Sequence, residues 1–471
     1  MFAQFNFSDT LLKVIKDVGF EKPSLIQEKV IPHIMEGRDL IGQAKTGTGK
    51  TAAFAWPSIE KIQANLPQVQ MLVIAPTREL ATQVCEEIQR FGRPFGIKCV
   101  SISGGSSYAR QIDAIKQGGH VVVATPGRLL DLMNSRRIPK MNPKIVVLDE
   151  ADEMLDMGFL DDIQSIFEYL PAERQTLLFS ATMPPAIQKL AQKILKDPLM
   201  ITTNSGKEIT NQDIQQEAYI VEEGERKNAL IRLLDAYQPP KSIVFCRTRA
   251  DCDQLNQSLQ GAGYSSAALH GDLEQRQRER VLAALKEGKI SVLVATDVAA
   301  RGLNVTDVSH VFNYHLPMAT ESYVHRIGRT GRAGNKGIAL TLVTPREMHK
   351  LKQIQAGAGS PIGQKRIPSL QDVKKNKLSD LTKKLGAQVV NPDAQAFLQT
   401  IEDSANKSEI TLKLLSMYLS SLEVAGPDKI GVDPERLSQM ERAPRPDQKR
   451  NRGGGYGRFD DKRRGRSFQR R

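Results

Sequence analysis

Short apolar runs alternate with segments of helical periodicity along most of the chain. The first such runs are Met71–Ala75, Val121–Ala124, Ile145–Leu148 and Thr176–Phe179, and each predicts a strand buried on both faces. Helical patterns such as Glu79–Phe91 and Ala186–Leu195 lie between them, and an earlier helical pattern runs from Ser8 to Gly19. This alternation predicts an α/β fold in which a parallel sheet is covered by helices.

The alternation stops in the polar stretch Thr202–Gln215, which is typical of a linker, and then begins again. The second set of predicted strands is Ser242–Cys246, Ser266–Leu269, Val292–Ala295, Val308–Asn313 and Ile338–Val343, and the predicted helices between them include Arg226–Ala236, Cys252–Leu259 and Glu274–Glu287. We therefore expect a first α/β domain at residues 1–205, a linker at 206–214 and a second α/β domain at 215–360.

The pattern changes after the second domain. Residues 361–440 have helical periodicity only, over Leu370–Leu385 and over the more apolar Ser408–Leu422, a helix that must bury its side chains somewhere. The plainer interpretation of this segment is a helix folded back on the second domain. From residue 441 to 471 Pro, Gly and Arg dominate, and we expect a disordered tail.

The composition is that of a water-soluble protein. Of 471 residues 40% are hydrophobic and 25% charged, which excludes wholesale disorder and fibrous classes. No apolar run reaches the roughly 18 residues needed to span a bilayer, and the N-terminus lacks the pattern of a secretory signal. Four scattered cysteines without a CxxC pair argue against a disulfide framework or a zinc site. We expect a cytoplasmic protein without membrane association.

The positive charge is concentrated at the C-terminus. The net charge is +13, and Glu441–Arg471 contains twelve Lys or Arg and four Asp or Glu, a balance of +8 that leaves +5 for the rest. Such a tail is typical of polyanion binding, although a purely solubilising tail has the same composition.

Polar motifs follow directly on several predicted strands. They are Pro76-Thr77-Arg78, Thr125–Arg128, Asp149–Asp152, Ser180-Ala181-Thr182 and Thr296-Asp297. Because ligands of open α/β sheets bind at the carboxyl ends of the strands, these motifs are expected to line one edge of each sheet.

A glycine-rich loop at residues 44–51 has the sequence AKTGTGKT. It departs from GxxxxGK[ST] because Ala44 replaces the first glycine, but its backbone N–H groups can still cradle phosphates at a helix N-terminus. We expect Thr46, Gly47, Thr48, Gly49, Lys50 and Thr51 to bind a nucleotide. Lys50 would reach the β- and γ-phosphates, and the Thr51 hydroxyl would bind Mg²⁺.

Two acids end a buried strand at Asp149 and Glu150. Because unpaired acids are costly there, the pair indicates chemistry. Asp149 can hold Mg²⁺ through its water shell, and Glu150 can act as general base on the attacking water. In the second domain Arg326, Arg329 and Arg332 fall within HRIGRTGR, and arginines facing a phosphate site stabilise charge on the transferring γ-phosphoryl group; an exposed basic face is the plainer interpretation.

The spelling and order of these motifs resemble those of the DEAD-box RNA helicases of superfamily 2. The resemblance runs from about Phe2 to Thr344, and residues 149–152 spell DEAD. It implies two tandem RecA-like domains, an RNA-stimulated ATPase with ATP and Mg²⁺ as cofactors, and ATP-dependent unwinding or remodelling of RNA duplexes and RNA–protein complexes.

The resemblance also implies roles for single residues. The stretch from Gly19 to Gln27 is similar to the family's Q motif, in which Gln27 would read the adenine edge and Phe20 would stack on the base. Arg329 and Arg332 would be arginine fingers. Ser180, Thr182 and His325 would couple hydrolysis to domain movement, and Asp297 and Gly302 would help close the nucleotide site. Asn304 stands where the family usually has Asp, and its amide can still hydrogen-bond a ribose.

The same resemblance places RNA against both domains, through contacts to phosphates and 2′-hydroxyls that do not read the base sequence. The residues implied are Pro76, Thr77, Arg78, Gly104, Gly105, Thr125, Pro126, Gly127, Arg128, Arg247, Thr248, Gln275, Arg278 and Thr296. The helical segment is similar to the dimerisation segment of some bacterial cold-shock-type members, which implies a homodimer interface within residues 370–422, with the folded-back helix as the alternative. The Arg/Gly-rich tail resembles RGG-like RNA-binding arms, and RNA-decay and ribosome-assembly proteins are candidate partners. Two other functions use the same residues, an ATP-gated RNA clamp or annealer and a DNA translocase, although the DEAD spelling and Gln27 argue against the translocase.

Overall fold

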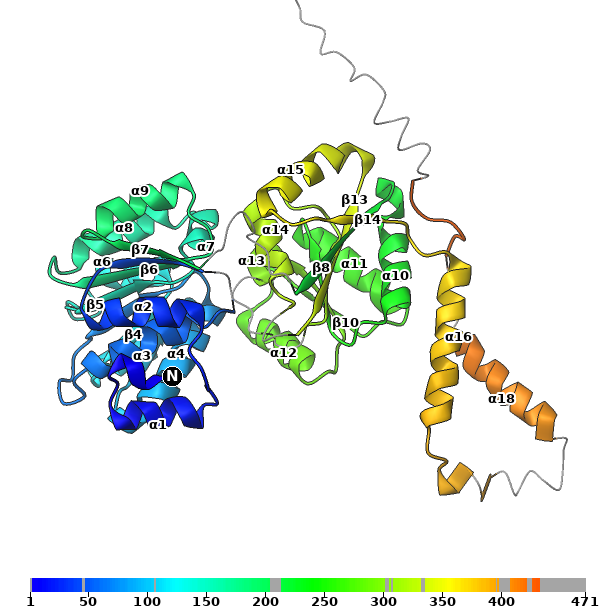
Figure 1. The fold of residues 1–471 in the computed structure, drawn as a ribbon, viewed down its shortest axis with the longest axis horizontal. Coiled ribbons are helices and arrows are strands. Elements are labelled where there is room, and N and C mark those ends of the chain that lie inside the picture. The colour runs from blue at the N-terminus through cyan, green and yellow to red at the C-terminus, as the bar shows by residue number, and fades with distance from the viewer. Residues whose placement is uncertain are drawn as a thin grey trace, which may run out of the picture. The chain divides into compact units, whose positions relative to one another are not determined.

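Two parallel sheets of seven strands each form the core of the protein (Figure 1). The computed structural model describes residues 2–44, 47–105, 107–203, 213–300, 305, 308–331, 335–394, 396–397, 407–421 and 426–432. The strand orders are β3-β4-β2-β5-β6-β1-β7 and β10-β11-β9-β12-β13-β8-β14. Counted from the first strand of each sheet the two orders are the same, so the chain contains the same α/β fold twice, as expected.

The first sheet contains every strand predicted for residues 1–205 and three more. Its strands are β1 (Leu40–Gln43), β2 (Met71–Ile74), β3 (Cys99–Ile102), β4 (Val121–Ala124), β5 (Ile145–Leu148), β6 (Gln175–Ser180) and β7 (Leu199–Thr202). The additional strands β1, β3 and β7 have only four residues each, and polar or glycine residues interrupt them, so their apolar signal is weak.

Helices cover both faces of this sheet. Within β2, Met71 and Val73 pack against one hydrophobic cluster, whereas Leu72 and Ile74 pack against the other, as the two-residue period of a strand requires. The first cluster lies under α1 (Asp9–Asp17), α2 (Leu25–Met35), α3 (Lys50–Lys61) and α4 (Arg78–Gly92). The second lies under α5 (Tyr108–Lys116), α6 (Pro126–Asn134), α7 (Ala151–Asp156), α8 (Leu160–Tyr169) and α9 (Pro185–Ile194).

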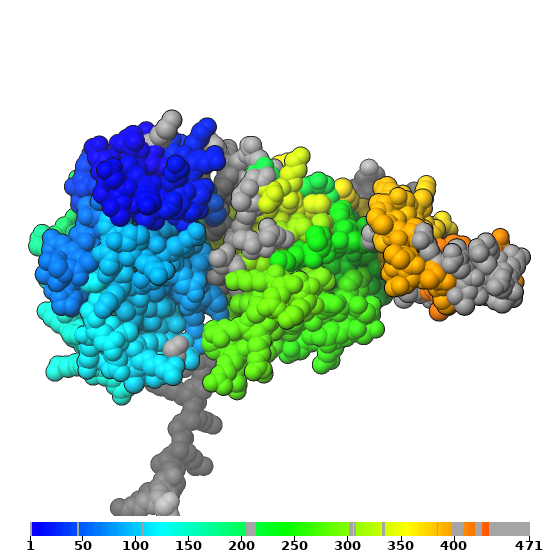
Figure 2. Space-filling model, turned by 90° about the horizontal axis from the view of Figure 1, so that it is seen from below, coloured from blue at the N-terminus to red at the C-terminus, as the bar shows by residue number. Residues whose placement is uncertain are grey.

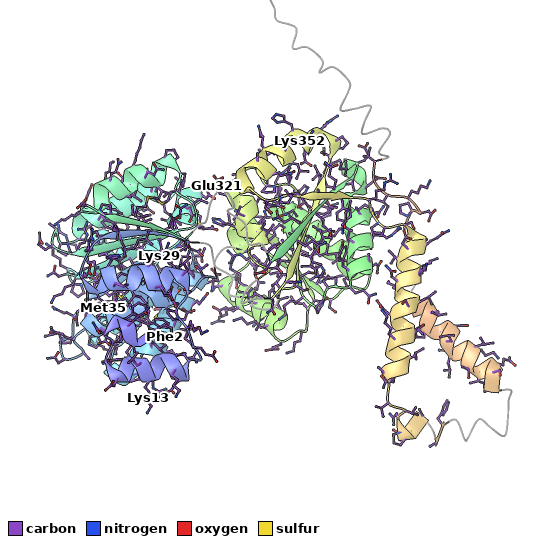
Figure 3. All side chains as sticks on the ribbon, viewed as in Figure 1. Phe2, Lys13, Lys29, Met35, Glu321 and Lys352 are labelled. Atoms are coloured by element: carbon purple, nitrogen blue, oxygen red, sulfur yellow. The ribbon has the colours of Figure 1, made fainter. Side chains whose placement is uncertain are left out.

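The N-terminal residues belong to the first domain. Ser8, where the predicted helical pattern begins, caps α1, since its side chain accepts a hydrogen bond from the Leu11 N–H. Lys13 projects from the outer side of α1, while Phe2 is buried (Figure 3). In the space-filling view the dark-blue N-terminal residues form one continuous surface of this domain (Figure 2).

The second sheet extends beyond both expected boundaries of its domain. Its strands are β8 (Ile214–Ile220), β9 (Ser242–Cys246), β10 (Ser266–Leu269), β11 (Val292–Thr296), β12 (His310–Asn313), β13 (Gly337–Val343) and β14 (Gly363–Lys365). β8 begins at Ile214, inside the expected linker. β14 pairs with β8, so the sheet continues five residues past the expected end at 360. A glycine and two polar residues form β14, and backbone pairing, not side-chain pattern, makes it a strand.

The helices of the second domain are α10 (Arg226–Tyr237), α11 (Arg249–Gly261), α12 (Gln275–Lys286), α13 (Asp297–Ala300), α14 (Thr320–Ile327) and α15 (Met348–Ala358). Of these, α10, α11 and α12 lie where helices were predicted. α10 and α11 share one hydrophobic cluster with the sheet, and the short α13 packs in the other with Leu285 of α12.

The helical segment is partly attached to the second domain. Helix α16 (Leu370–Ala387) buries Val373 completely, and its Lys377 forms a 2.7 Å ion pair with Asp235 of α10. Arg232 of α10 makes a second attachment. Its buried guanidinium donates hydrogen bonds to the carbonyl of Pro368, just before α16, at 3.1 Å and to the carbonyl of Pro427 at 2.7 Å.

Helix α18 (Lys407–Ser421) forms at the predicted place, but the structure does not bury it. The side chains of Leu412, Leu414 and Met417 are 62%, 55% and 72% exposed. Among the residues that the structure describes, nothing provides the expected burial of this apolar helix. Across the described ranges, no helix combines the length and apolar character that a membrane crossing requires.

Candidate nucleotide and RNA site

The glycine-rich loop leads from β1 into α3. Gly47 and Gly49 have φ of +78° and +85°, the left-handed region that favours glycine, and Gly49 precedes the first residue of α3. Lys50 is buried, and its Nζ donates a 3.3 Å hydrogen bond to the Ala44 carbonyl. The loop thus places an ammonium group and the N-terminus of a helix together, which suits a polyphosphate.

Gln27 lies against this loop. Its side chain is 1% exposed, accepts a hydrogen bond from the Ser24 N–H at 2.9 Å and donates one to the Gly49 carbonyl at 3.1 Å. A Cβ at position 49 would lie 2.5 Å from Gln27 Nε2, so a second reason for glycine is this close approach. The Q-motif glutamine and the phosphate loop therefore meet in the folded chain.

Phe20 of the Q motif and Phe2 near the N-terminus both pack on Trp56 of α3. Phe20 and Phe2 both meet the indole edge to face, with ring centroids 5.0 and 5.3 Å from that of Trp56. Phe20 remains partly exposed, whereas Phe2 is buried in the core. Trp56 thus fixes the position of Phe20 beside the Gln27 helix, a role that the sequence pattern did not indicate.

The acid pair is buried at the end of β5. Asp149 Oδ1 accepts a 3.0 Å hydrogen bond from the Glu150 N–H, and burial raises the pKa of Asp149 to about 7 against the opposing charge of Lys50. Glu150 adopts φ of +54°, an uncommon value for a non-glycine residue. Its Oε2 is buried and, in the described structure, has no hydrogen-bond partner. A buried carboxylate oxygen that has no hydrogen-bond partner and lies beside a second acid is typical of a ligand-binding site.

The residues here fit Mg²⁺ held through phosphates and water. Thr51 and Asp149 provide the hydroxyl and carboxylate oxygens that Mg²⁺ prefers. Within the described ranges no three His, Cys, Asp or Glu side chains converge as a metal cage. Few protein ligands are the usual pattern for Mg²⁺ that arrives with a nucleotide.

Asp152 connects the DEAD tetrapeptide to β6. Its Oδ2 accepts hydrogen bonds from the Thr182 N–H at 2.8 Å and the Thr182 hydroxyl at 2.9 Å, and its own N–H donates to the Ser180 hydroxyl at 3.2 Å. The predicted coupling residues Ser180 and Thr182 thus contact the tetrapeptide directly, at Asp152.

His325 of α14 reaches the same carboxylate. Its Nε2 lies 3.5 Å from Asp152 Oδ2, and its Nδ1 lies 2.6 Å from Glu153 Oε1. Burial alone would lower the pKa of His325, but the Glu153 and Asp152 carboxylates raise it to about 10. Burial would raise the pKa of Asp152, yet His325, Lys50 and the Thr182 N–H outweigh it and hold this pKa well below the usual range.

Asp297 holds an arginine of the HRIGRTGR motif. Its two oxygens accept hydrogen bonds from Arg326 Nε at 2.5 Å and Nη2 at 2.8 Å, and Arg326 also donates to the His315 carbonyl at 2.7 Å. The neighbouring Arg329 is buried, and its Nε donates to the His325 carbonyl at 3.3 Å. Asp297 therefore orients the arginine motif from within its own domain.

In the first domain the predicted RNA residues come together at the carboxyl edge of the sheet. The Arg78 guanidinium packs on Gly104 and Gly105, where an added Cβ would lie 2.7 and 2.4 Å from its nitrogens. Thr77 caps α4, and Thr125 and Pro126 begin α6. A groove of about 470 Å³ is lined by members of all three segments, including Arg78, Gly104, Thr125 and Arg128.

In the second domain the predicted RNA residues occupy the ends of β9 and β11 and the start of α12. Gln275 and Arg278 line the same groove. Arg247 is exposed, and its Nη2 lies 3.4 Å from Glu347 Oε1. Thr248 caps α11 through the Asp251 N–H at 3.1 Å, and Thr296 ends β11.

Arg278 has an acidic partner that the sequence reasoning missed. Its Nε and Nη2 donate to Glu79 Oε1 at 3.0 and 2.7 Å, and both side chains are only 13% exposed. Glu79 follows Arg78 directly in the strand-end motif, so its position at the sheet edge was a signal. Glu153, which follows DEAD directly, was missed in the same way.

Some predicted residues and segments lie outside the described residues. These are Thr46, Gly302, Asn304 and Arg332, most of the linker, and the tail from residue 441. The first domain contains the described nucleotide-site candidates Gln27, Lys50, Thr51, Asp149 and Glu150. The second domain contains His325 and Arg329, and His325 contacts Asp152 and Glu153 of the first domain.

Family models and relatives agree on one assignment. Residues 24–190 match the DEAD/DEAH box helicase model, and residues 225–334 match the helicase conserved C-terminal domain. The chain is 47% identical over 453 residues to the DEAD-box ATP-dependent RNA helicase RhpA of Helicobacter pylori, covering 95% of this chain and 89% of the relative. It is 44% identical over 434 residues to the ATP-dependent RNA helicase CshA of Listeria monocytogenes, covering 92% of this chain and 82% of the relative.

Solved structures share the fold. S. cerevisiae Dbp5 bound to RNA and ADP BeF3 matches with a TM-score of 0.74 and 32% identity, over 81% of this chain and 98% of that one. Mss116p bound to ssRNA and AMP-PNP matches with a TM-score of 0.71 and 27% identity, over 89% and 85%. The two tandem RecA-like domains, the meeting of Gln27 with the phosphate loop and these similarities lead to one conclusion: the chain belongs to the DEAD-box family of ATP-dependent RNA helicases.

Proposed function

We propose that this chain couples ATP binding and hydrolysis to local unwinding or remodelling of RNA duplexes and RNA–protein complexes. The observation that carries the proposal is the contact of His325 with Asp152, because it joins the arginine motif of one domain to the acid motif of the other. Because His325 contacts Asp152 only when the two domains are together, this contact can make hydrolysis depend on domain closure.

Within this proposal the first domain binds ATP. Gln27 reads the adenine edge, Phe20 stacks on the base, and Gly47, Thr48, Gly49 and Lys50 hold the phosphates, with Thr46 in the same loop. Thr51 and Asp149 hold Mg²⁺, which when bound neutralises charge on the phosphate oxygens. Glu150 orients and deprotonates the attacking water, and its unpartnered Oε2 supports that role.

The second domain completes the catalytic site. Arg329 and Arg332 act as arginine fingers on the γ-phosphate, and Gly302 and Asn304 close the nucleotide site from the same domain. Asp297 acts as a positioning residue through Arg326. RNA lies along the strand-end motifs of both domains and is held by backbone contacts, so binding does not depend on base sequence.

The test is displacement of one strand from a short RNA duplex. We expect displacement with ATP and none in the protein-free control or with a Lys50→Ala chain. An RNA clamp or annealer would bind RNA with ATP and displace nothing. ATP hydrolysis stimulated by RNA and not by DNA would separate a helicase for RNA from a DNA translocase, and equal stimulation would contradict the proposal.

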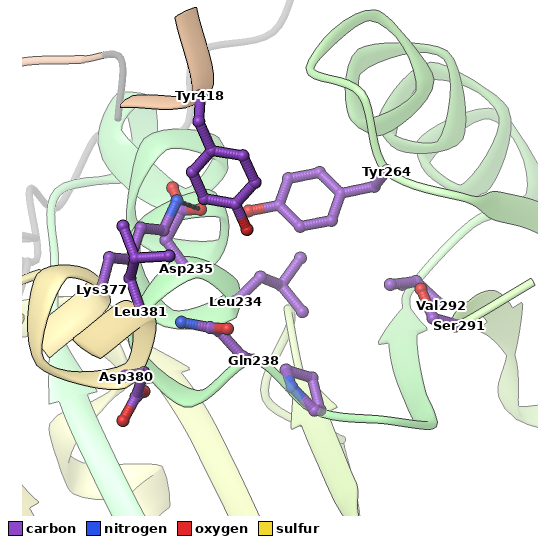
Figure 4. Close-up of a pocket in the computed structure, with 11 residues that line it drawn as sticks. Leu234, Asp235, Gln238, Tyr264, Ser291, Val292, Lys377, Asp380, Leu381 and Tyr418 are labelled. Carbon is purple, nitrogen blue, oxygen red and sulfur yellow. Dashed lines mark hydrogen bonds and ion pairs between the residues drawn. The ribbon is translucent and has the colours of Figure 1, made fainter. Parts of the chain in front are cut away.

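The exposed apolar surface of α18 favours a second function, self-association. A pocket of about 280 Å³ lies where α16 meets α10, and Tyr418 of α18 lines it together with Lys377, Asp235 and Tyr264 (Figure 4). Apolar side chains point to all sides of α18. The side that carries Tyr418 lines the pocket, and Leu412, Leu414 and Met417 remain exposed. We propose that a second copy covers these through residues 370–422, because isolated monomers rarely expose large apolar patches.

The setting in the cell is a further part of the proposal. The relatives named above are bacterial, which supports a cytoplasmic site of action, with RNA-decay or ribosome-assembly proteins as partners. The basic tail from residue 441 would add RNA affinity through its twelve Lys or Arg, counted from Glu441.

A further inference from the structure

Tyr108 gathers two guanidinium groups beside the RNA edge of the first domain. It is the first residue of α5, three residues after Gly105. Arg128 of α6 places its Cζ 3.8 Å from the centroid of the Tyr108 ring, and the Cζ of Arg137 lies 5.4 Å from the same centroid. Both distances are in the range of cation–π attraction. Tyr108 belongs to no motif discussed above.

The ring is held in place from α6. The Tyr108 hydroxyl forms a hydrogen bond with Asp131, which lies three residues after Arg128 on the same helix. Arg128 Nη1 also donates to Gln111 Oε1 at 3.3 Å, and Gln111 donates in turn to the Ser103 carbonyl at 2.8 Å. The α5 and α6 helices thus hold ring and guanidinium as one assembly.

The end of α6 directs Arg137 toward this assembly. Arg136 has φ of +52°, a conformation that favours glycine, and its N–H donates to the Met133 carbonyl at 3.0 Å. The Arg137 N–H then donates to the Leu132 carbonyl at 3.3 Å. This pair of bonds is the Schellman closure of a helix, and it turns the chain so that Arg137 lies over Tyr108.

The location favours an anion of RNA. Tyr108, Asp131 and Arg128 line the same groove as Gly104 and Thr125. Arg137 is exposed, and within the described ranges it forms no ion pair. Its guanidinium and that of Arg128 are at most about 9 Å apart, because both lie on one ring. That spacing lets two arginines contact nearby phosphates of one strand.

We propose that Arg137 binds a backbone phosphate of the RNA beyond those held by the strand-end motifs, and that Tyr108 is the positioning residue that aligns Arg137 and Arg128. This inference rests on the proposed RNA function of the same edge. It adds one phosphate contact on the side of the groove formed by α5 and α6, and it requires no contact with a base.

The test is the salt dependence of RNA binding, measured by fluorescence anisotropy of a short labelled oligouridylate with a non-hydrolysable ATP analogue. We expect Arg137→Ala to weaken binding and to lower the slope of log K against log salt by about 0.7, the value for one phosphate of a single strand. Arg137→Lys should keep the slope, because it keeps the charge.

Two variants of Tyr108 separate the ring from the hydroxyl. Tyr108→Phe keeps the stacking surface, so we expect a nearly unchanged slope, whereas Tyr108→Leu removes it and should weaken binding by about two- to fivefold. Thermal unfolding of both variants shows whether they remain folded. The matched control is Arg93→Ala, an exposed arginine at the end of α4, on the opposite edge of the sheet from the strand-end motifs.

An Arg137→Ala chain with the wild-type slope, or with a change equal to that of Arg93→Ala, overturns the inference. RNA-stimulated ATP hydrolysis by the wild-type chain is measured in parallel. If the wild-type chain lacks it, the proposed function fails. If the wild-type chain has it and Arg137→Ala leaves the slope unchanged, only the phosphate contact at Arg137 is wrong.

Discussion

His325 Nε2 lies 3.5 Å from Asp152 Oδ2, so the histidine of the arginine motif contacts the last residue of the DEAD tetrapeptide. Glu153 approaches the other ring nitrogen at 2.6 Å. Two buried carboxylates around one imidazole favour the doubly protonated, cationic ring. The contact between the domains is therefore an ionic one, and its strength should depend on pH.

We predict that closure of the two domains weakens as the pH rises from neutral toward 10. The pKa of His325 is raised from 6.5 to about 10, so its contribution is complete below 6.5 and is lost as the pH passes through 10. The depressed pKa of Asp152 acts at the other end, since its contribution is present above 3.8 and is lost only in acid. A His325→Gln chain should lack the alkaline loss.

Fluorescence energy transfer between dyes on the two domains, with RNA and a non-hydrolysable ATP analogue, measures closure. The difference between wild type and His325→Gln isolates this histidine from other groups that titrate in the same range. Parallel pH profiles for the two chains would show that His325 does not provide the ionic contact.

Glu150→Gln should abolish turnover and spare nucleotide binding. The carboxylate is buried with Oε2 unpartnered, and an amide of the same shape keeps the packing but cannot accept a proton. Removal of a general base typically lowers the rate by about 10²–10⁴-fold. Single-turnover hydrolysis and binding of a fluorescent ATP analogue separate the two effects. Glu86→Gln, an exposed acid of α4, is the matched control, and RNA-stimulated hydrolysis at the wild-type rate in Glu150→Gln would refute the assigned base.

The sequence yields candidate nucleotide-site residues more readily than it yields the residues packed around them. Lys50, Asp149 and Glu150 could be placed because each belongs to a motif of recognisable spelling, and parallel strands bring such motifs to one edge of the sheet. β1, β3 and β7 were not predicted, since four residues with a polar or glycine member give no clear period. β14 is a strand through its pairing with β8 alone, which side-chain patterns do not encode.

Ion pairs between residues far apart in the sequence could not be predicted, for a different reason. Glu79 and Arg278 are 199 positions apart and meet only when both domains are folded. The resemblance assigned Arg278 to RNA, and the structure adds a carboxylate partner for it. Arg232 was also unremarked, because a buried arginine that binds the carbonyls of Pro368 and Pro427 has no local signature.

The Glu79–Arg278 pair should favour domain closure. Both side chains are 13% exposed, so breaking the pair leaves a largely desolvated charge. We expect Glu79→Arg and Arg278→Glu each to weaken RNA-dependent closure, and the double exchange to recover part of it, with a coupling of about 1 kcal/mol or more. The double-mutant cycle is measured by energy transfer between the domains. Additive effects would mean that the two residues act separately, Arg278 on RNA alone.

Deletion of Ala443–Arg471 should lower RNA affinity and flatten its salt dependence. The deleted residues include eleven of the twelve Lys or Arg counted from Glu441, and each phosphate that is no longer neutralised reduces the slope by about 0.7 on single-stranded RNA. Binding at several salt concentrations measures the slope. If the shortened chain keeps the wild-type slope, the tail is a solubiliser.

The exposed face of α18 predicts a dimer that a single charge can break. Leu415 is 37% exposed in the single chain, and its neighbours Leu412, Leu414 and Met417 are more so. If a second copy covers them, light scattering should give twice the chain mass, and Leu415→Asp should run as a monomer, because a buried unpaired carboxylate costs several kcal/mol. Met200→Asp places the same charge at a 55% exposed position of β7 and should leave the mass unchanged. If the wild-type chain is monomeric over the whole concentration range, the proposed dimer is wrong and no second copy covers α18.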